Sequence, residues 1–166
     1  MTQTSHTAHR RSFLFMGAAL GLVAAAPALA DEHGFAGAPQ RKVTDAQWRK
    51  MLPPASYGVL RQEDTEQPFT SPLLNEHRHG TFACIACGLP LFKSEWKYDS
   101  GTGWPSFFTA IDANLGRKSD FKIIEERTEY HCARCGGHQG HVFNDGPQPT
   151  GLRYCNNGVA LKFIPA

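Results

Sequence analysis

From residue 80 onward the chain alternates between short apolar runs and short clusters of turn-forming residues. The runs are rich in aromatic and β-branched residues and include "TFACIA", "LPLF", "FKIIEERTEYHC", "HVF", "LRYC" and "VALKF". They are separated by Gly88 and by "DSGTGWPS", "NLGRKSD", "CGGHQG" and "NDGPQPTG". This spacing is typical of antiparallel sheets made of many short strands. We therefore predict a mainly β domain with no long amphipathic helix in this region.

Before residue 80 the pattern is more polar and partly helical. Thr44 can cap a short helix that ends at Leu52, where two consecutive prolines stop it. Residues 62–80 are polar and contain prolines, which predicts mostly turns. Residues 31–42 contain glycine and proline and predict a flexible lead-in, so the domain itself should span residues 43–166.

The first thirty residues have the layout of an export signal. Arg10 and Arg11 precede an uncharged apolar stretch, and an Ala28-Leu29-Ala30 sequence offers a cleavage site. The paired arginines resemble the twin-arginine type. A membrane anchor is the alternative, because residues 13–30 are just long enough to span a bilayer. The weak hydrophobicity of this stretch and the cleavable end favour removal, with the mature protein in the periplasm and not stably bound to membrane.

Charge argues against a nucleic-acid partner. The chain has 17 basic and 15 acidic residues, and removal of residues 1–30 takes away two arginines and no acids, which leaves 15 of each. A neutral domain has no general attraction to phosphate backbones. A monomer is the default expectation, since no sequence signal for assembly is visible.

Four of the five cysteines form two matching C-x-x-C-G motifs, "CIACG" and "CARCG". Two residues between thiolates allow both sulfurs to bind one metal from one turn, and the glycine accepts the positive φ that such a turn needs. Two such turns suit a structural, tetrahedral Zn²⁺ site. The alternative is two disulfides, which exported proteins often contain. The predicted zinc ligands are Cys84, Cys87, Cys132 and Cys135.

Cys155 is left over, in the segment "GLRYCNNG". In an extended segment, residues two apart share a face, which places Arg153 and Asn157 beside this cysteine. A cation beside a thiol favours the nucleophilic thiolate. A small buried hydrophobe is the plainer interpretation of a lone cysteine, but the polar neighbours favour a reactive role.

Two further segments carry candidate chemistry. His138 and His141 lie in the glycine-rich "GGHQGHVFNDG", with Asp145 close by, and a histidine can serve as the acid–base partner of a cysteine. Surface histidines and additional metal ligands are alternatives. Trp104 lies between Gly103 and Pro105, where it could wall a small apolar pocket or simply pack in the core.

Taken together, "PFTSPLLNEHRHGTFACIACGLPLF", "YDSGTGWPSF" and "HCARCGGHQGHVFNDGPQPTGLRYCNNGVALKF" resemble the B-type methionine-R-sulfoxide reductases. The resemblance extends from about residue 43 to residue 164. It implies two small antiparallel sheets with short N-terminal helices, held by a Cys₄ zinc site. It also implies one structural Zn²⁺ ion per chain as the cofactor.

The resemblance also implies roles for individual residues. Cys155 would attack the sulfoxide sulfur and become a sulfenic acid, and His138 or His141 would deliver a proton to the oxygen. Trp104 would receive the methyl group of the substrate, with Phe143 nearby. The remaining catalytic residues implied by the family are Asp145, Arg153 and Asn157. The substrates would be oxidised proteins that carry methionine-R-sulfoxide.

One position departs from the family pattern. Many members carry a second, resolving cysteine where this chain has Thr102, and threonine cannot form a disulfide. The sulfenic acid should therefore be reduced by an external thiol, from a thioredoxin-like protein or a small molecule. Two rival functions remain: a thiol-based peroxide sensor or peroxidase, which also needs one reactive cysteine, and a zinc-ribbon nucleic-acid module, which would need a basic face.

Overall fold

The structure is a computed structural model that describes Met1, residues 34–121 and residues 127–166. The predicted export segment, apart from Met1, and its cleavage site lie outside these ranges, so they stay predictions. Within the described residues, no helix combines the length and the hydrophobicity needed to cross a bilayer.

Two short helices begin the domain. In α1 (Asp45–Met51) the Thr44 side chain accepts the Gln47 N–H, and the Gln47 side chain accepts the Thr44 N–H, which forms a capping box. The predicted first helix is thereby confirmed. The following helix, α2 (Pro54–Gln62), is not predicted by the sequence pattern, because its Ser, Tyr, Gly and Val residues are weak helix formers. Proline at its first position needs no N–H partner, and burial of its apolar face stabilises it.

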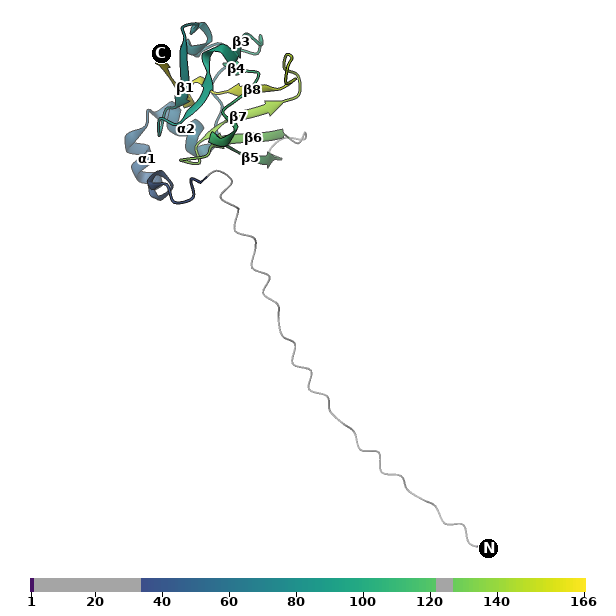
Figure 1. Ribbon diagram of the computed structural model, residues 1–166. Helices are drawn as coiled ribbons and strands as arrows, with labels where there is room; N and C mark the ends of the chain where they lie inside the picture. Colours follow the sequence, from purple (N-terminus) through teal and green to yellow (C-terminus); the bar gives the residue numbers. More distant parts are fainter. Residues whose placement is uncertain (2–33, 122–126) are drawn as a thin grey trace. The chain divides into compact units, whose positions relative to one another are not determined.

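The strands form two antiparallel sheets, as predicted. The three-stranded sheet has the order β2–β1–β9, with β1 at Gly80–Cys84, β2 at Pro90–Lys93 and β9 at Leu161–Pro165. The six-stranded sheet has the order β3–β4–β8–β7–β6–β5. Its strands are β3 (Lys97–Tyr98), β4 (Ser106–Phe107), β5 (Leu115–Asp120), β6 (Arg127–Cys132), β7 (His138–Phe143) and β8 (Arg153–Asn156). Figure 1 shows β8, β7, β6 and β5 side by side.

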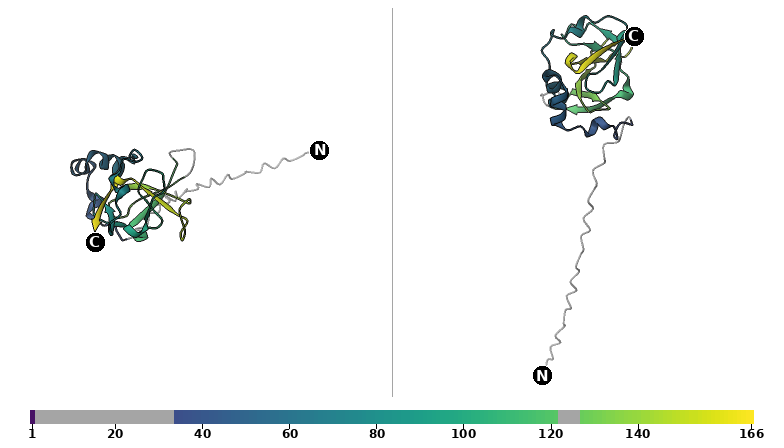
Figure 2. Two further views of the ribbon diagram at one scale, coloured as in Figure 1. Left: turned by 90° about the horizontal axis from the view of Figure 1, so that it is seen from above. Right: turned by 90° about the vertical axis from the view of Figure 1, so that its left-hand side faces the viewer.

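Short 3₁₀ turns connect these elements, and both helices lie together at one side of the strands (Figure 2). The turns are η1 (Pro39–Lys42), η2 (Pro72–Asn75), η3 (Ser94–Trp96), η4 (Asp112–Asn114) and η5 (Gly158–Ala160). Helix α2 contacts both β7 and η5. It therefore supports the strand that carries His138 and His141 and the turn that follows the Cys155 strand.

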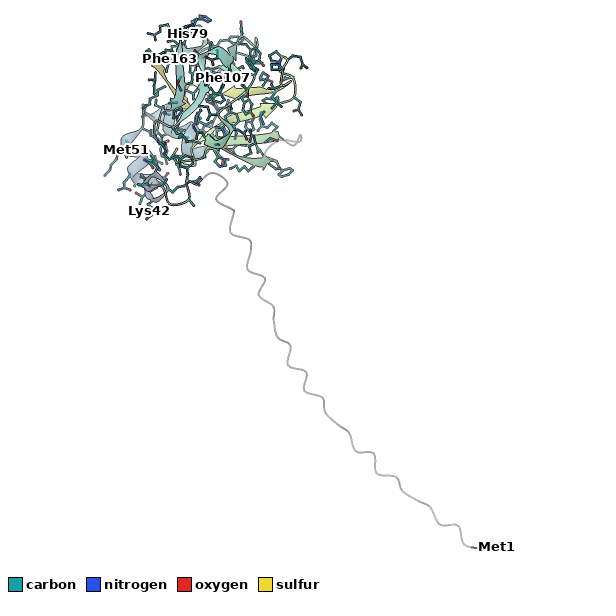
Figure 3. All side chains as sticks on the ribbon, in the orientation of Figure 1. Met1, Lys42, Met51, His79, Phe107 and Phe163 are labelled. Atoms are coloured by element: carbon teal, nitrogen blue, oxygen red, sulfur yellow. The ribbon has the colours of Figure 1, made fainter. Side chains whose placement is uncertain are left out.

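The core is an aromatic cluster shared by the two sheets. Phe107, labelled in Figure 3, stacks on Phe92 with ring centroids 4.1 Å apart and meets Phe82 edge-on at 5.1 Å. Tyr130 and Tyr154 continue the cluster with a centroid distance of 5.5 Å. These rings are buried. Burying each large ring stabilises the fold by about 2 kcal/mol, and the offset and edge-to-face contacts add to this. The cluster fixes β4 and β8 relative to each other.

One predicted turn is wrong. The polar residues of "NLGRKSD" predict a turn, but residues 115–120 form β5, at the edge of the six-stranded sheet. Leu115 and Asp120 are buried at its ends, and the three residues 117–119 face solvent. An edge strand exposes one side to solvent and tolerates charged residues there. The amino-acid composition of such a strand therefore resembles that of a loop.

Part of the predicted lead-in packs against the domain. Of residues 31–42, the structure describes 34–42, and η1 lies within them. Phe35 packs against the core, and the Arg134 guanidinium lies 5.5 Å from the centre of its ring. The Arg41 guanidinium donates a hydrogen bond to the carbonyl of Ala133. This stretch is thereby attached to the second C-x-x-C turn.

Candidate active site and cysteine cluster

The two C-x-x-C-G turns have the same backbone structure. In each, the glycine N–H donates to the carbonyl of the first cysteine at 2.8 Å, from Gly88 to Cys84 and from Gly136 to Cys132. The glycines have φ values of 72° and 70°, which is the left-handed conformation that glycine adopts without strain. One turn joins β1 to β2 and the other joins β6 to β7.

The four sulfurs of these turns come together in one cluster, with all of them within 4.8 Å of one another. Sγ of Cys84 lies 3.7 Å from Sγ of Cys135, and Sγ of Cys87 lies 3.4 Å from Sγ of Cys132. These distances are too long for a disulfide bond, which measures about 2.05 Å. They are close to the roughly 3.8 Å between sulfurs of a tetrahedron with metal–sulfur bonds of about 2.3 Å. The cluster is therefore suited to hold one metal ion.

A buried polar bridge connects this cluster to the strand of the fifth cysteine. The Gln139 side chain, which is fully buried, lies with Nε2 3.5 Å from Sγ of Cys84 and with Oε1 3.5 Å from Nδ2 of Asn156. Asn156 also accepts a hydrogen bond from the Tyr130 hydroxyl at 2.8 Å. Both amides are thus satisfied inside the core, as buried polar groups must be.

Cys155 lies apart from the cluster, in the middle of the six-stranded sheet. On β8 it pairs with Ser106 of β4 on one side and with His141 of β7 on the other. Directly paired residues present their side chains on the same face of a sheet. Cys155 lines a small cup of about 120 Å³ together with Thr65, Trp104, Arg127, Gly140, His141, Phe143, Asn156 and Asn157.

Burial is the largest influence on the Cys155 thiol and raises its pKa above the ordinary 9.0. Arg153 and a hydrogen bond from Thr102 act in the opposite direction but do not outweigh burial. The predicted proximity of Arg153 to the sulfur is therefore present, yet the free protein holds a thiol at neutral pH. Ionisation needs a proton acceptor in the cup.

The two histidines come together through a strand irregularity. Residues three apart in a regular strand face opposite sides of a sheet. Here His138 pairs with His131 and Gly140 pairs with Tyr130, so Gln139 is an additional residue on β7, which is a β-bulge. The bulge brings the rings of His138 and His141 to 5.4 Å between centroids.

Each imidazole has a carboxylate partner that the sequence does not reveal. Nε2 of His141 lies 2.7 Å from Oδ2 of Asp120, and Nδ1 of His138 lies 2.7 Å from Oε1 of Glu129. Each of these nitrogens therefore carries a proton and donates it to the carboxylate. Burial lowers the pKa of His141 below 6.5, although Asp120 opposes this effect. His141 is neutral in the free protein and faces the cup, whereas His138 is buried behind it.

Trp104 is held by the segment that precedes the first sheet. Its indole N–H donates to the backbone carbonyl of Glu66 at 3.1 Å. The Glu66 N–H donates to Oδ1 of Asn157 at 3.0 Å, and its carboxylate accepts the N–H groups of Gly158 and Val159. Glu66 thus joins the tryptophan to the turn that follows Cys155.

Arg153 is fixed by a two-pronged ion pair. Its Nε and one terminal nitrogen donate to the two carboxylate oxygens of Asp145 at 2.8 and 2.7 Å. Its guanidinium also lies over the Phe143 ring, 4.4 Å from the centre. The pair lowers the pKa of Asp145 and keeps the arginine oriented toward the cysteine.

Comparison with known proteins agrees with this arrangement. The SelR domain family matches residues 52–165. The peptide methionine sulfoxide reductase MsrB of Leptospira interrogans is 51% identical over 121 residues, which covers 72% of this chain and 92% of that protein. This chain belongs to the MsrB family. The MsrB proteins of Thiobacillus denitrificans and Bradyrhizobium diazoefficiens are 52% and 50% identical over 123 residues each, which is 74% of this chain and 93% and 88% of those proteins.

In this MsrB-family chain, some predicted site residues line the cup and the others lie behind it or beside it. Those that line it are Cys155, His141, Trp104, Phe143 and Asn157. The others lie behind the cup wall or beside it: His138, Arg153 and Asp145. Asn157 accepts the Glu66 N–H and donates to the Gln139 carbonyl, so both ends of its amide are bound to backbone groups; its predicted catalytic role stays a prediction.

Several residues of the site were missed from the sequence. They are Thr65, Glu66, Asp120, Arg127, Glu129 and Asn156. Asn156 is the direct neighbour of Cys155 in the sequence. The other five lie in "EDTEQPF" and "KSDFKIIEERTEY", which are rich in charged residues and carry no spacing that distinguishes a site acid from a surface acid. Only the pairing of β5, β6 and β7 brings these acids to the histidines.

Proposed function

We propose that this chain reduces methionine-R-sulfoxide in oxidised proteins to methionine, with Cys155 as the nucleophile. The observation that carries the proposal is the position of that one cysteine. It lies outside the four-sulfur cluster and beside His141, in a cup walled by Trp104 and Phe143. A cup of this size suits a single methionine side chain, and its mixed polar and aromatic lining suits a polar sulfoxide on an apolar stem.

Cys155 and His141 together supply the one proton that the sulfoxide oxygen needs. The resting pair is a thiol and a neutral imidazole, which together hold one transferable proton. His141 takes that proton as the thiolate attacks the sulfoxide sulfur, and the imidazolium then gives it to the sulfoxide oxygen. A sulfur–sulfur bond forms and the protonated oxygen becomes a hydroxyl on the methionine sulfur. That hydroxyl then moves to the Cys155 sulfur as the sulfur–oxygen bond of the substrate and the sulfur–sulfur bond break, which leaves a sulfenic acid and releases methionine. The sulfoxide is reduced by two electrons and the thiol is oxidised by two.

The aromatic wall selects the epimer. Trp104 is held in place by its bond to the Glu66 carbonyl, and the methyl group of the substrate packs on its face. With the methyl on the indole and the oxygen toward His141, only one configuration at sulfur presents its open side to Cys155. The family relationship supports the R epimer as that configuration.

An external thiol returns Cys155 to its resting state. Thr102 reaches the Cys155 sulfur only as a hydrogen-bond donor, and the other four cysteines of the chain are in the cluster. The first thiol condenses with the sulfenic acid and releases water, and a second thiol reduces the mixed disulfide. Peptide mass spectrometry of peroxide-treated protein should show no disulfide between Cys155 and another cysteine of this chain.

The four-cysteine cluster holds Zn²⁺ in a structural role. Four thiolates at tetrahedral spacing leave no open coordination position. The ion would tie the β1–β2 turn to the β6–β7 turn and so stabilise the sheet that carries the histidines. The N-terminal layout further supports export to the periplasm and removal of residues 1–30, which sequencing of the mature N-terminus would test.

Turnover of a defined substrate tests the function. Wild-type protein should reduce N-acetyl-methionine-R-sulfoxide with dithiothreitol and leave the S epimer largely untouched. Cys155→Ser should reduce neither, because a hydroxyl is a far weaker nucleophile, while its melting temperature stays near that of the wild type. Activity that survives this substitution would contradict the proposal. Turnover of peroxide without turnover of sulfoxide would instead favour the thiol peroxidase or sensor.

A further inference from the structure

Phe69 combines three features that folding stability alone does not explain. It has a φ of 65°, in the left-handed region that bulky side chains rarely occupy. The residue is 70% exposed, so burial does not offset the backbone strain. Glycine would adopt the same conformation without strain. A strained residue with an exposed apolar ring points to a role outside the fold.

The position of Phe69 is fixed against the loop that carries Trp104. The Phe69 N–H donates to the carbonyl of Gly103 at 2.7 Å. A side chain at Gly103 would collide with Pro68 and with Phe69, so the two segments are in direct contact. The adjacent Glu66 carbonyl holds the Trp104 indole. The exposed ring is therefore attached to the wall of the catalytic cup.

A second hollow shares the Trp104 wall with the cup. This groove has a volume of about 450 Å³ and is lined by Phe69, Leu74, Asn75, Glu76, His77, Ser94, Lys97, Tyr98, Asp99, Gly103, Trp104 and Pro105. Trp104 lines both the groove and the cup, so the indole is a wall that the two hollows share. The cup is large enough for one methionine sulfoxide side chain, and the groove is the neighbouring hollow across the indole.

The lining of the groove is mixed, with aromatic surface at Phe69 and Trp104 and polar side chains elsewhere. Acidic and basic side chains both border it, and Glu76 is already paired with Arg78 at 2.6 Å. The ammonium of Lys97 is bound to the Leu74 carbonyl at 2.7 Å. Asp99 is exposed at the border of the groove, and its Oδ1 accepts the Gly101 N–H at 2.9 Å. Phe69 and Trp104 offer the aromatic surface of the lining.

We propose that this groove binds the residues that flank the oxidised methionine in an extended protein segment, with an apolar side chain against Phe69. The proposal rests on the reductase function above, because the occupant is the remainder of that substrate. Free methionine sulfoxide lacks these flanking residues, so the groove would discriminate protein substrates from the free amino acid.

The test compares three R-sulfoxide substrates: the N-acetyl amino acid, a pentapeptide with glycine on both sides, and a pentapeptide with leucine on both sides. Wild-type kcat/KM should be about tenfold higher for the leucine peptide than for the glycine peptide. Phe69→Gly should remove this preference and leave the N-acetyl substrate within about twofold of wild type. Because glycine relieves the strained φ, its melting temperature should equal or exceed that of the wild type.

Met51→Ala is the matched control. Met51 is a large apolar residue that is 62% exposed on α1, away from the groove lining, and it is labelled in Figure 3. This variant should keep the wild-type preference. A Phe69→Gly protein that keeps the leucine preference, or that loses activity equally on all three substrates, would overturn the groove proposal alone. Wild-type failure on the N-acetyl substrate would overturn the reductase function and the groove proposal with it.

Discussion

The Glu129 carboxylate gives the sharpest quantitative prediction, because two histidines surround it inside the sheet. Nδ1 of His138 lies 2.7 Å from one of its oxygens and Nδ1 of His131 lies 3.4 Å from the other. Burial by itself would raise the pKa of Glu129, but hydrogen bonds and charge from the two histidines outweigh burial and lower it to about 2. We therefore expect Glu129→Gln to lower the free energy of unfolding.

The size of the effect follows from that pKa. Lowering it from 4.5 to about 2 corresponds to about 3 kcal/mol of stability that the ionised carboxylate contributes. The group borders a hollow of about 230 Å³ that also contains Lys118, so screening by water reduces the expected value to about 2 kcal/mol. For a lowered carboxyl pKa, this stability is fully present above pH 4.5 and is lost as the pH falls toward 2.

The assay is urea unfolding of wild-type and Glu129→Gln protein at several pH values between 7 and 2.5. The difference in unfolding free energy should be about 2 kcal/mol at pH 7 and should shrink toward zero at the acid end. Acid also releases any bound metal, but it does so in both proteins, so the difference isolates the carboxylate. Glu95→Gln is the control, because Glu95 is exposed and forms only a 3.7 Å surface pair. A difference that stays constant with pH, or that Glu95→Gln reproduces, would refute the reasoning.

Two further predictions concern the catalytic pair and the metal. The pH profile of kcat/KM should have a plateau between the His141 pKa, which lies below 6.5, and the Cys155 pKa, which lies above 9.0. Below this range His141 is protonated and cannot accept the proton of Cys155. Above it Cys155 has lost its proton to solvent, so His141 has none to give to the sulfoxide oxygen. A Cys155 thiol that titrates near neutral pH would contradict this mechanism. Removing the metal with a chelator should cost several kcal/mol of stability, because the cluster joins two turns that are distant in sequence. Circular dichroism melting with parallel metal analysis measures this, and an unchanged melting temperature in metal-free protein would exclude a structural ion.

The site shows where sequence reasoning succeeds and where it stops. Cys155 is singled out by its polar neighbours on the same strand. Trp104, Phe143, His138 and His141 are assigned to the site by the family resemblance, since their local sequence alone leaves other roles open. Asp120 and Glu129 are missed, since nothing local distinguishes them from surface acids. The prediction that Arg153 would favour an ionised Cys155 has the right direction for that one interaction, yet burial of the thiol outweighs it.

The sequence by itself determined the features that depend on near neighbours. Turn residues between short apolar runs predicted the antiparallel strands, and the two C-x-x-C-G motifs predicted the sulfur cluster, because turn geometry is set within a few residues. Tertiary structure decided what depends on distant segments. The bulge at Gln139 brings His138 and His141 together, and strands β5 and β6 supply their acids. The charge state of Cys155 likewise follows from summed burial and long-range electrostatics, which no local pattern encodes.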